Sequence, residues 1–293
     1  MLDSNVPLRD ECNLCSQGTY SDSTDKALVR SNIARFANER FEVWRCSNCA
    51  SLHSRQTVEL SRYYQDYPMH RGAKSWVSRL THRAHIKHLE RMGLKKGDRV
   101  LDFGCGVGAL VEALSSAGYE SQGFDRYNPA FNSPEILERQ YDFIVLQDVL
   151  EHVEDPVELL AELGKILSPA GRIYIGTPNG AQLSLKKAET YLHSLHQPFH
   201  LHILSDQALR LIAEKLKFRV CQMNDRFFGD TLFPFLNIRF ALFVIEANGN
   251  TFDSADVERI PLSWRLLTPR AFFFAFFGGF FPTRDQISAT LAL

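Results

Sequence analysis

The stretch from Arg99 to Tyr127 constrains the fold more than any other part of the chain. It reads as an apolar strand that carries Asp102, a glycine-rich turn, a helix, and a second strand that ends at Asp125. Three glycines stand in the turn: Gly104, Gly106 and Gly108. They let the backbone pass close under a ligand, because a side chain there would take up the ligand's space. This order of elements predicts half of a doubly wound α/β nucleotide site, with the ligand at the carboxyl ends of the strands.

The spacing of the glycines indicates which nucleotide the turn accepts. A dinucleotide site uses the pattern G-x-G-x-x-G, which seats a pyrophosphate on the helix N-terminus. This chain has G-x-G-x-G, with the carboxylate of Asp102 two residues before the first glycine. That carboxylate would repel a pyrophosphate but suits S-adenosylmethionine, which has no phosphate and carries an amine and a sulfonium. Asp125 follows Gly104 by 21 residues, a separation at which a carboxylate reaches a ribose diol.

Stretches further along the chain fit the same architecture. Tyr141–Gln147 is a nearly continuous apolar run, as in a parallel strand buried on both faces. The run DVLEHVEDP at 148–156 follows it, and there Asp155 and Pro156 suit the N-cap and the first position of a helix. Residues 172–179 and 286–293 read as two further strands.

Together with the glycine turn, these stretches resemble class I S-adenosylmethionine-dependent methyltransferases over roughly residues 75–225. The resemblance implies an α/β fold with a doubly wound, mostly parallel sheet of the seven-stranded type, closed by an antiparallel strand at 286–293. It also implies S-adenosylmethionine as the cofactor. The residues that would bind it are Asp102, Gly104, Cys105, Gly106, Gly108, Asp125, Gln147 and Asp148.

The chain departs from the family pattern after Asp125. Only 15 residues separate Asp125 from Tyr141, where the family usually fits a helix, a strand and an acidic turn for the adenine. Two X-Pro pairs, at 128–129 and 133–134, also interrupt any long helix there. A shortened segment must therefore build the adenine pocket.

Four cysteines form two CxxC pairs, Cys12-x-x-Cys15 and Cys46-x-x-Cys49. The two-residue spacing places both thiolates of each pair on one metal ion, and two pairs complete a tetrahedral four-thiolate zinc site. Such a zinc is structural because four protein ligands leave no open position. Disulfides are the alternative, and a reducing compartment disfavours them.

The segment around the cysteines resembles the zinc-ribbon head of a subset of bacterial methyltransferases, including sugar-nucleotide C-methyltransferases. The resemblance implies a zinc-ribbon head and tyrosine-rich link at residues 1–68. A methyltransferase domain with a Phe-rich C-terminal lid or interfacial segment would then occupy residues 69–293.

Three histidines are candidates for the catalytic base. An acceptor hydroxyl or carbon acid must lose a proton during methyl transfer, and histidine titrates near neutral pH. His152 stands just beyond the strand at 141–147, where it either acts as the base or only braces the loop. His200 and His202 alternate, so only one of them can face a pocket if that segment is extended.

Two further stretches have both a structural and a functional interpretation. Residues 75–92 are expected to form a helix with a basic residue at every fourth position. These basic side chains either form a solvated helix face or attract an anionic substrate. Ala271–Phe281 holds seven phenylalanines in 11 residues, whereas a bilayer span takes roughly 20 residues. It predicts either a buried helical lid or an interfacial element on a membrane, with Arg265 and Arg270 near the headgroups.

The leading hypothesis is methyl transfer from S-adenosylmethionine to a small molecule or glycan, such as a sugar nucleotide or lipid-linked sugar. The alternatives are an O-methyltransferase of a hydrophobic phenol or quinone, an RNA methyltransferase, and a non-catalytic cofactor-binding scaffold. A net charge of −1 and a pI of about 6.8 disfavour nucleic acid. The N-terminus shows no signal or lipidation motif, so we expect a cytoplasmic protein, including one held peripherally at the inner membrane face. The oligomeric state is not indicated.

Overall fold

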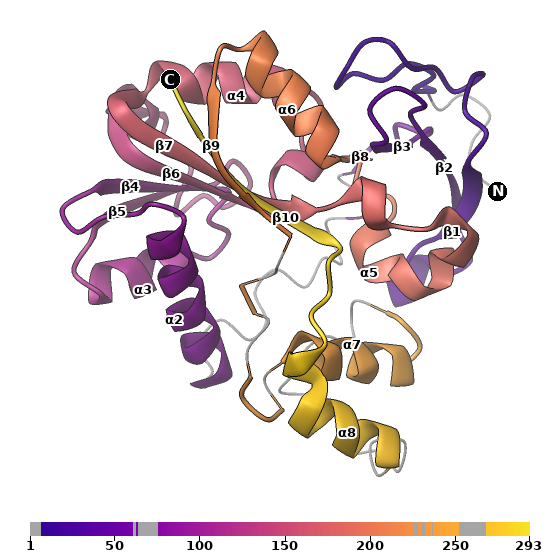
Figure 1. Cartoon of the computed structure of the whole chain (residues 1–293). Helices are drawn as coiled ribbons and strands as arrows, with labels where there is room; N and C mark the ends of the chain where they lie inside the picture. The colour runs from indigo at the N-terminus through magenta and orange to yellow at the C-terminus, as the bar shows by residue number, and fades with distance from the viewer. Residues whose placement is uncertain are drawn as a thin grey trace. The chain divides into compact units, whose positions relative to one another are not determined.

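Two units make up the structure, a computed structural model that describes residues 7–60, 63, 76–225, 228–229, 232–235, 237–251 and 268–293. Figure 1 shows the elements of both units. The six-stranded unit comprises Met69–Thr177, Arg210–Phe228 and Gln286–Leu293. The four-stranded unit comprises Met1–Pro68, Pro178–Leu209 and Gly229–Asp285.

The six-stranded unit contains a mostly parallel sheet in the order β5-β4-β6-β7-β10-β9 (Figure 1). Its strands are β4 (Arg99–Phe103), β5 (Glu120–Phe124), β6 (Tyr141–Gln147), β7 (Leu167–Pro178), β9 (Arg219–Asn224) and β10 (Gln286–Ala292). Strand β4 pairs in parallel with β5 and β6, and β6 pairs in parallel with β7, whereas β10 runs antiparallel to β9. The predicted doubly wound α/β sheet with an antiparallel closing strand is therefore confirmed.

Six strands rather than seven form this sheet among the described residues, because the segment after β5 is too short to supply another. Strand β5 lies at the edge, and the only helical or strand element between it and β6 is the 3-10 turn η2 (Pro134–Glu138). Pro129 and Pro134 carry no amide hydrogen, so neither can donate to a sheet ladder. The departure seen in the sequence thus removes one strand from the family pattern.

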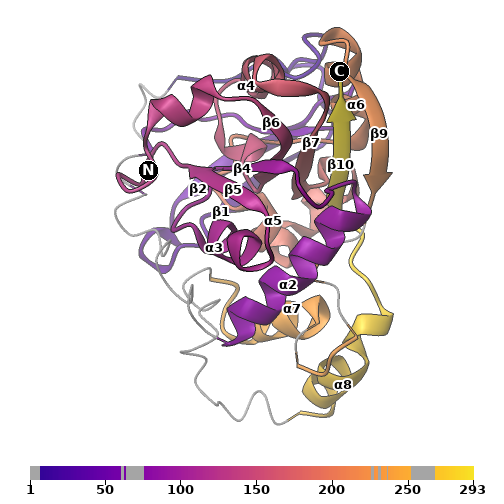
Figure 2. The ribbon, with the colours of Figure 1, turned by 90° about the vertical axis from the view of Figure 1, so that its left-hand side faces the viewer.

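Helices lie on both faces of this sheet (Figures 1 and 2). Helices α2 (Trp76–Arg91) and α3 (Ala109–Ser116) lie on one face, where their apolar side chains join a buried cluster with β4, β6 and β7. Helix α4 (Pro156–Lys165) lies on the other face. It begins where the sequence predicts, because the Asp155 carboxylate accepts from the Glu158 amide and Pro156 takes the first helical position.

The four-stranded unit contains an antiparallel sheet in the order β1-β2-β3-β8. Its strands are β1 (Lys26–Arg30), β2 (Arg40–Arg45), β3 (Leu52–Ser54) and β8 (His202–Ile203). The remaining helices in the described part of the chain are α5 (Leu192–Leu195), α6 (Asp206–Lys215), α7 (Ile238–Ala247) and α8 (Pro269–Phe277). Because β8 pairs with β3, this unit draws in segments beyond residue 68. The expected division into 1–68 and 69–293 stays a prediction.

Arg45 links the N-terminal strands to the segment at 180–183. Its guanidinium forms an ion pair with Asp25 at 2.8 Å. The same group donates to the carbonyl oxygens of Ala50 at 3.0 Å, Gly180 at 2.7 Å and Leu183 at 2.6 Å. Charge-assisted bonds to a half-buried guanidinium are each worth about 1.5–3 kcal/mol, and a buried carbonyl that loses its donor is destabilising.

We expect Arg45→Met to lower the free energy of unfolding by about 2–4 kcal/mol, because it removes these bonds while keeping the aliphatic stem. Equilibrium denaturation with urea measures this change. The matched control is Arg40→Met, since the exposed Arg40 guanidinium donates to the nearby Ala37 carbonyl. Equal effects of the two substitutions would contradict the role assigned to Arg45.

Candidate functional site

The glycine turn after β4 has the left-handed backbone that its sequence requires. The φ angles of Gly104, Gly106 and Gly108 are +79°, +56° and +77°. Other residues rarely adopt such angles, because a Cβ atom meets the neighbouring carbonyl. A Cβ on Gly104 would also lie 2.6 Å from the Val149 side chain, just beyond β6. The turn is therefore fixed against the end of β6, with Gly104 itself exposed.

The Asp125 carboxylate, at the end of β5, closes the site from the other side. One oxygen accepts from the Gly106 amide at 2.8 Å, and the other accepts from the amides of Tyr127 and Asn128 at 2.8 and 3.0 Å. The Asn128 side chain then donates back to the Gly106 carbonyl at 2.7 Å. The carboxylate thus ties the glycine turn to the segment after β5. Oδ2 accepts a single hydrogen bond, so it keeps room for a donor such as a ribose hydroxyl.

Asp102 places a second carboxyl beside this arrangement. The residue is only 5% exposed, near the end of β4. Burial, and to a smaller extent the negative charge of Asp125, raises the pKa of the Asp102 carboxyl to about 7. Two acidic groups close together in a buried place favour a cation as their partner.

The end of β6 contributes further polar groups. Gln147 accepts a hydrogen bond from the Tyr174 hydroxyl at 3.3 Å. Asp148 has a left-handed backbone with φ +53°, and its amide donates to the Gly176 carbonyl at 2.8 Å. The residue is exposed, and partial desolvation raises the pKa of its carboxyl to about 6. The turn thus presents a carboxyl next to Gly104.

Glu151 is an acidic residue that the sequence reasoning missed. It is fully buried in the 3-10 turn η3 (Leu150–His152). Burial, with a contribution from the negative charge of Asp148, raises the pKa of Glu151 well above its usual value. The sequence signal that could have identified Glu151 is the position of a glutamate between Leu150 and His152, directly after the apolar strand.

Phe131 is the side chain that the shortened segment places against the glycine turn. Its ring lies where Cβ atoms on Gly108 and Gly123 would be, at 2.2 and 3.1 Å. The Phe131 amide donates to the Asn128 carbonyl, and its carbonyl accepts from the Asp125 amide. The sequence reasoning named no side chain from this segment. Phe131 is an aromatic residue that packs against the glycine turn.

The three candidate histidines have different environments. His152 is half-buried in η3, within the six-stranded unit. His202 is fully buried in β8, where its ring contacts His53 and its Nδ1 lies 3.3 Å from the Arg9 guanidinium. These contacts lie within the four-stranded unit.

His200 has the hydrogen bond expected of an oriented base. Its Nδ1 donates to the Ser194 carbonyl at 2.7 Å within the four-stranded unit. This bond fixes the tautomer and makes Nε2 the basic nitrogen. His200 and His202 thus have different hydrogen-bond partners, and the expectation that only one of them faces a pocket stays a prediction.

The four cysteines of the CxxC pairs come together in the four-stranded unit. Their sulfur atoms all lie within 4.8 Å of one another. The Cys12–Cys15, Cys15–Cys46 and Cys12–Cys49 distances are 3.5, 3.6 and 3.7 Å. Tetrahedral Zn–S bonds of about 2.3 Å require sulfur separations of about 3.8 Å. The thiol positions thus fit a tetrahedral four-thiolate site without rearrangement.

The backbone around the thiols supports the same interpretation. The residue after each CxxC pair is left-handed, with φ +57° at Ser16 and +60° at Ala50. The amides of these two residues donate back to the carbonyls of Cys12 and Cys46, so that each pair forms a tight turn. Gly18 leaves space for a thiol, because a Cβ there would lie 2.2 Å from the Cys46 sulfur. Gly18 was not predicted from the sequence.

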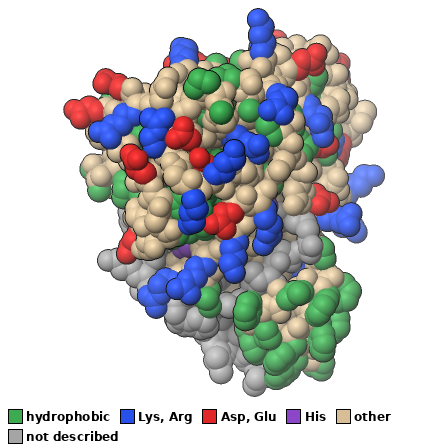
Figure 3. All heavy atoms as spheres, turned by 60° about the vertical axis from the view of Figure 1, so that its left-hand side comes forward, with side chains coloured by type: hydrophobic (Ala, Val, Ile, Leu, Met, Phe, Trp, Pro, Cys, Tyr) green, Lys and Arg blue, Asp and Glu red, His purple; other side chains and the backbone are tan. Residues whose placement is uncertain are grey.

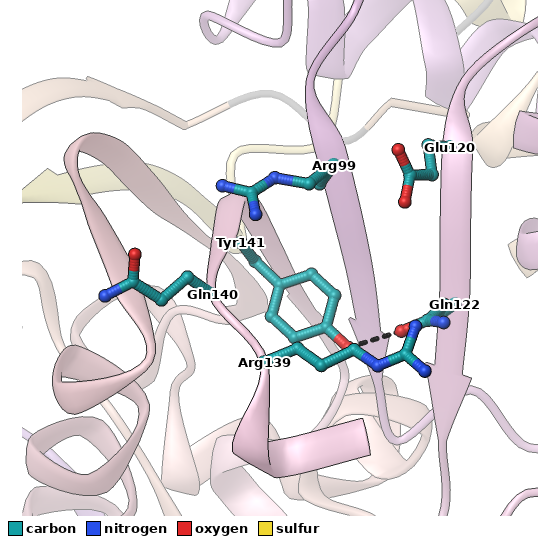
Figure 4. Close-up of a pocket in the computed structure, with 6 residues that line it drawn as sticks. All are labelled: Arg99, Glu120, Gln122, Arg139, Gln140 and Tyr141. Carbon is teal, nitrogen blue, oxygen red and sulfur yellow. Dashed lines mark hydrogen bonds between the residues drawn. The ribbon is translucent and has the colours of Figure 1, made fainter. Parts of the chain in front are cut away.

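A cavity of about 410 Å³ lies at the amino ends of strands β4, β5 and β6 (Figure 4). The glycine turn follows the opposite, carboxyl end of β4. The lining residues are Arg99, Glu120, Gln122, Arg139, Gln140 and Tyr141. The Tyr141 hydroxyl donates to Gln122 at 2.6 Å. The Arg99 guanidinium forms a bidentate ion pair with Asp142. None of the predicted cofactor residues lines this cavity.

Comparisons with known proteins point to one family. The model of a family described as a methyltransferase domain matches residues 74–223, just over half of the chain. Ubiquinone biosynthesis O-methyltransferase from Coxiella burnetii is 30% identical over 115 residues, which are 32% of this chain and 49% of that protein. The protein of the same description from Pseudomonas aeruginosa is 30% identical over 112 residues, 31% of this chain and 48% of that protein. The chain thus spans about half the length of these relatives.

Solved structures show weaker similarity. An S-adenosylmethionine-dependent methyltransferase from Archaeoglobus fulgidus has a TM-score of 0.43 and 20% identity, covering 73% of this chain and 94% of that one. At this level the similarity carries no argument about the site.

The Gly108–Phe131 contact yields a stability prediction. We expect Gly108→Ala to lower the free energy of unfolding by about 2–4 kcal/mol, because φ is positive and the new methyl group meets the Phe131 ring. Gly97→Ala is the control, since Gly97 has φ +91° but nothing within 4 Å of a Cβ. Urea denaturation should show a smaller loss for Gly97→Ala, of about 1 kcal/mol. A Gly108→Ala loss no larger than this would contradict the contact.

Proposed function

The chain belongs to the methyltransferase-domain family, and we propose that it transfers a methyl group from S-adenosylmethionine to a small-molecule or glycan-type acceptor. The observation that carries the proposal is the buried Asp102 carboxyl beside a left-handed glycine turn that Asp125 closes. A buried acidic group suits an amine and a sulfonium, and the glycine turn keeps its backbone exposed at Gly104.

Each group of the site has a role in this proposal. The carboxyls of Asp102 and Asp148 attract the cationic end of the cofactor, and Oδ2 of Asp125 accepts from a ribose hydroxyl. Phe131 borders the adenine side. Bound S-adenosylmethionine would supply an electrophilic methyl group, and transfer of this group to the acceptor would break the C–S bond and release S-adenosylhomocysteine. Holding the two reactants in near-attack geometry can supply about 7–11 kcal/mol of the barrier.

An acceptor hydroxyl or carbon acid also needs a base. His152 is our candidate because it follows Asp148 in the unit that holds the glycine turn. His200 is the second candidate, because its Nδ1 bond leaves Nε2 basic. His202 is the weakest of the three, since its ring is fully buried between protein groups.

The acceptor class follows from two separate arguments. The cysteine segment resembles the head of sugar C-methyltransferases, which favours a sugar nucleotide or a lipid-linked sugar. The alternative acceptor is a hydrophobic phenol or quinone, and the relatives described as ubiquinone biosynthesis O-methyltransferases favour it. Screening both classes by release of S-adenosylhomocysteine distinguishes them.

We also propose that Cys12, Cys15, Cys46 and Cys49 hold one structural zinc ion. The sulfur separations support this assignment, and four thiolates would leave the ion no open position for catalysis. The ion would hold the two CxxC turns together.

The Asp102 carboxyl predicts how cofactor binding depends on pH. Its raised pKa means that the charged form, which a cationic ligand needs, increases as pH rises through about 7. We expect the ratio of wild-type to Asp102→Asn affinity for S-adenosylmethionine to rise about tenfold from pH 6 to pH 8. Isothermal titration calorimetry measures both affinities. Taking the ratio removes the titration of the ligand's own amine.

Asp98→Asn is the matched control, because Asp98 precedes β4 and its carboxylate accepts from the Lys95 amide. The ratio of wild-type to Asp98→Asn affinity should stay constant over this pH range. A constant ratio for Asp102→Asn as well would contradict the assignment of Asp102 as the cation partner.

The base assignment predicts a loss of turnover. Once an acceptor is found, His152→Ala should lower kcat by about 10²–10⁴ while leaving the affinity for S-adenosylmethionine unchanged. His82→Ala on α2 is the control, as His82 bonds Ser78 on its own helix. Full kcat in His152→Ala together with a loss in His200→Ala would transfer the role to His200.

The metal assignment predicts one zinc ion per chain by elemental analysis of the purified protein. Cys46→Ser should lose the zinc and melt at a lower temperature, because one of four ligands is weakened. Cys221→Ser, which changes a partly exposed cysteine on β9, should keep both the zinc and the melting temperature. Equal zinc content in the two variants would contradict the four-thiolate site.

A further inference from the structure

Helix α8 and the 3-10 turn η9 (Gly278–Phe280) expose a dense set of aromatic side chains. Together with apolar residues of the neighbouring segment 232–235 they form what we call the phenylalanine face. Its members, each between 45% and 70% exposed, are Leu232, Phe233, Phe235, Phe272, Phe273, Phe276, Phe277, Phe280 and Phe281. Figure 3 shows apolar side chains gathered in one patch over this region.

Ring contacts connect several members of the phenylalanine face. The ring centroids of Phe235 and Phe276 lie 5.1 Å apart, and Phe273 lies 5.7 Å from both Phe277 and Phe281. At roughly 200 Å² of surface for each aromatic side chain, the exposed area is on the order of 1,000 Å². The largest apolar patch on a typical monomer is about 300–600 Å². Such an area in water requires an explanation.

The inner side of α8 is anchored, so the outward direction of these rings is a property of the fold. Ala271 and Ala275 are buried. The Asn237 side chain, which caps α7, donates to the carbonyls of Phe274 and Ala275 at 2.9 and 3.2 Å. Thr268 caps the start of α8 by accepting from the Ala271 amide. The helix cannot turn its phenylalanines inward without breaking these bonds.

The chemistry of the face favours lipid over protein. Between Ala271 and Phe281 no side chain carries a nitrogen or oxygen atom. A protein–protein interface forms about one hydrogen bond per 100–200 Å², so an area of this size would need polar side chains within it. Acyl chains need none.

The charges at the rim fit an anionic surface. Exposed arginines stand at both ends of the segment, Arg270 and Arg284, and residues 268–284 contain no acidic side chain. The pairing of Arg270 with Glu246, at 3.4 Å, is solvent-exposed and therefore weak. Arg239 supports the turn by donating to the carbonyls of Phe281 and Pro282. The rim is thus basic where a headgroup region would lie.

We propose that the phenylalanine face docks onto the surface of an anionic lipid bilayer. In the part of the chain that the structure describes, no helix is long and apolar enough to cross a membrane. Helix α8 therefore lies in the interface, with its rings among the acyl chains and Arg270 and Arg284 at the headgroups. The inference is independent of methyl transfer, because vesicle binding is measured without cofactor or acceptor.

The test is co-sedimentation of the full chain with vesicles of phosphatidylcholine alone or with one third phosphatidylglycerol. We expect the wild type to sediment with the anionic vesicles, and salt to weaken its binding to them. Phe272→Glu/Phe280→Glu should bind them at least tenfold less. Leu28→Glu is the matched control, because Leu28 is equally exposed on β1 outside the face, and it should bind as the wild type does.

Failure of the wild type to sediment with either vesicle would overturn the proposal, and this result does not depend on any variant folding. A second result that would contradict the proposal comes from the oligomeric state, which light scattering measures. A stable dimer that Phe272→Glu/Phe280→Glu converts to a monomer would assign the face to a second copy of the chain. Circular dichroism of each variant verifies that lost binding reflects the face and not unfolding.

Discussion

The hydrogen bonds of the Asp125 carboxylate hold the candidate cofactor site together. They join an amide of the glycine turn, at Gly106, to two amides of the segment after β5. One side chain thereby fixes both walls of the site before any ligand binds, which lowers the ordering cost of binding. Burial, and to a smaller extent the negative charge of Asp125, raises the pKa of the Asp102 carboxyl. In the function that we propose, a cationic ligand favours the ionised form of Asp102.

The six-stranded unit was predictable because its sequence signals are local. Buried parallel strands read as continuous apolar runs, and the glycine turn and the Asp155–Pro156 helix start have fixed spacings. The family resemblance is confirmed by the match over residues 74–223. The short segment after Asp125 could also be recognised by counting its residues in the sequence. It explains why the sheet has six strands and not seven among the described residues. The four cysteines come together as their spacing predicts.

The remaining features depend on contacts between distant parts of the chain. Nothing near residue 202 in the sequence indicates that β8 pairs with β3, some 150 positions away. Phe131 is defined by its fit against Gly108 and Gly123, and such packing leaves no periodic signal. The burial of Glu151 likewise depends on tertiary structure. The expected link at residues 59–67 lies largely outside the described residues, as does Arg265.

Native mass spectrometry of the purified chain, with and without S-adenosylmethionine, tests the central claim most directly. The site built by Asp102, Asp125 and the glycine turn predicts one bound cofactor per chain, in addition to one zinc ion. A chain that retains zinc but takes up no S-adenosylmethionine at millimolar concentration would contradict the claim. It would show that the shortened segment around Phe131 no longer forms a cofactor pocket.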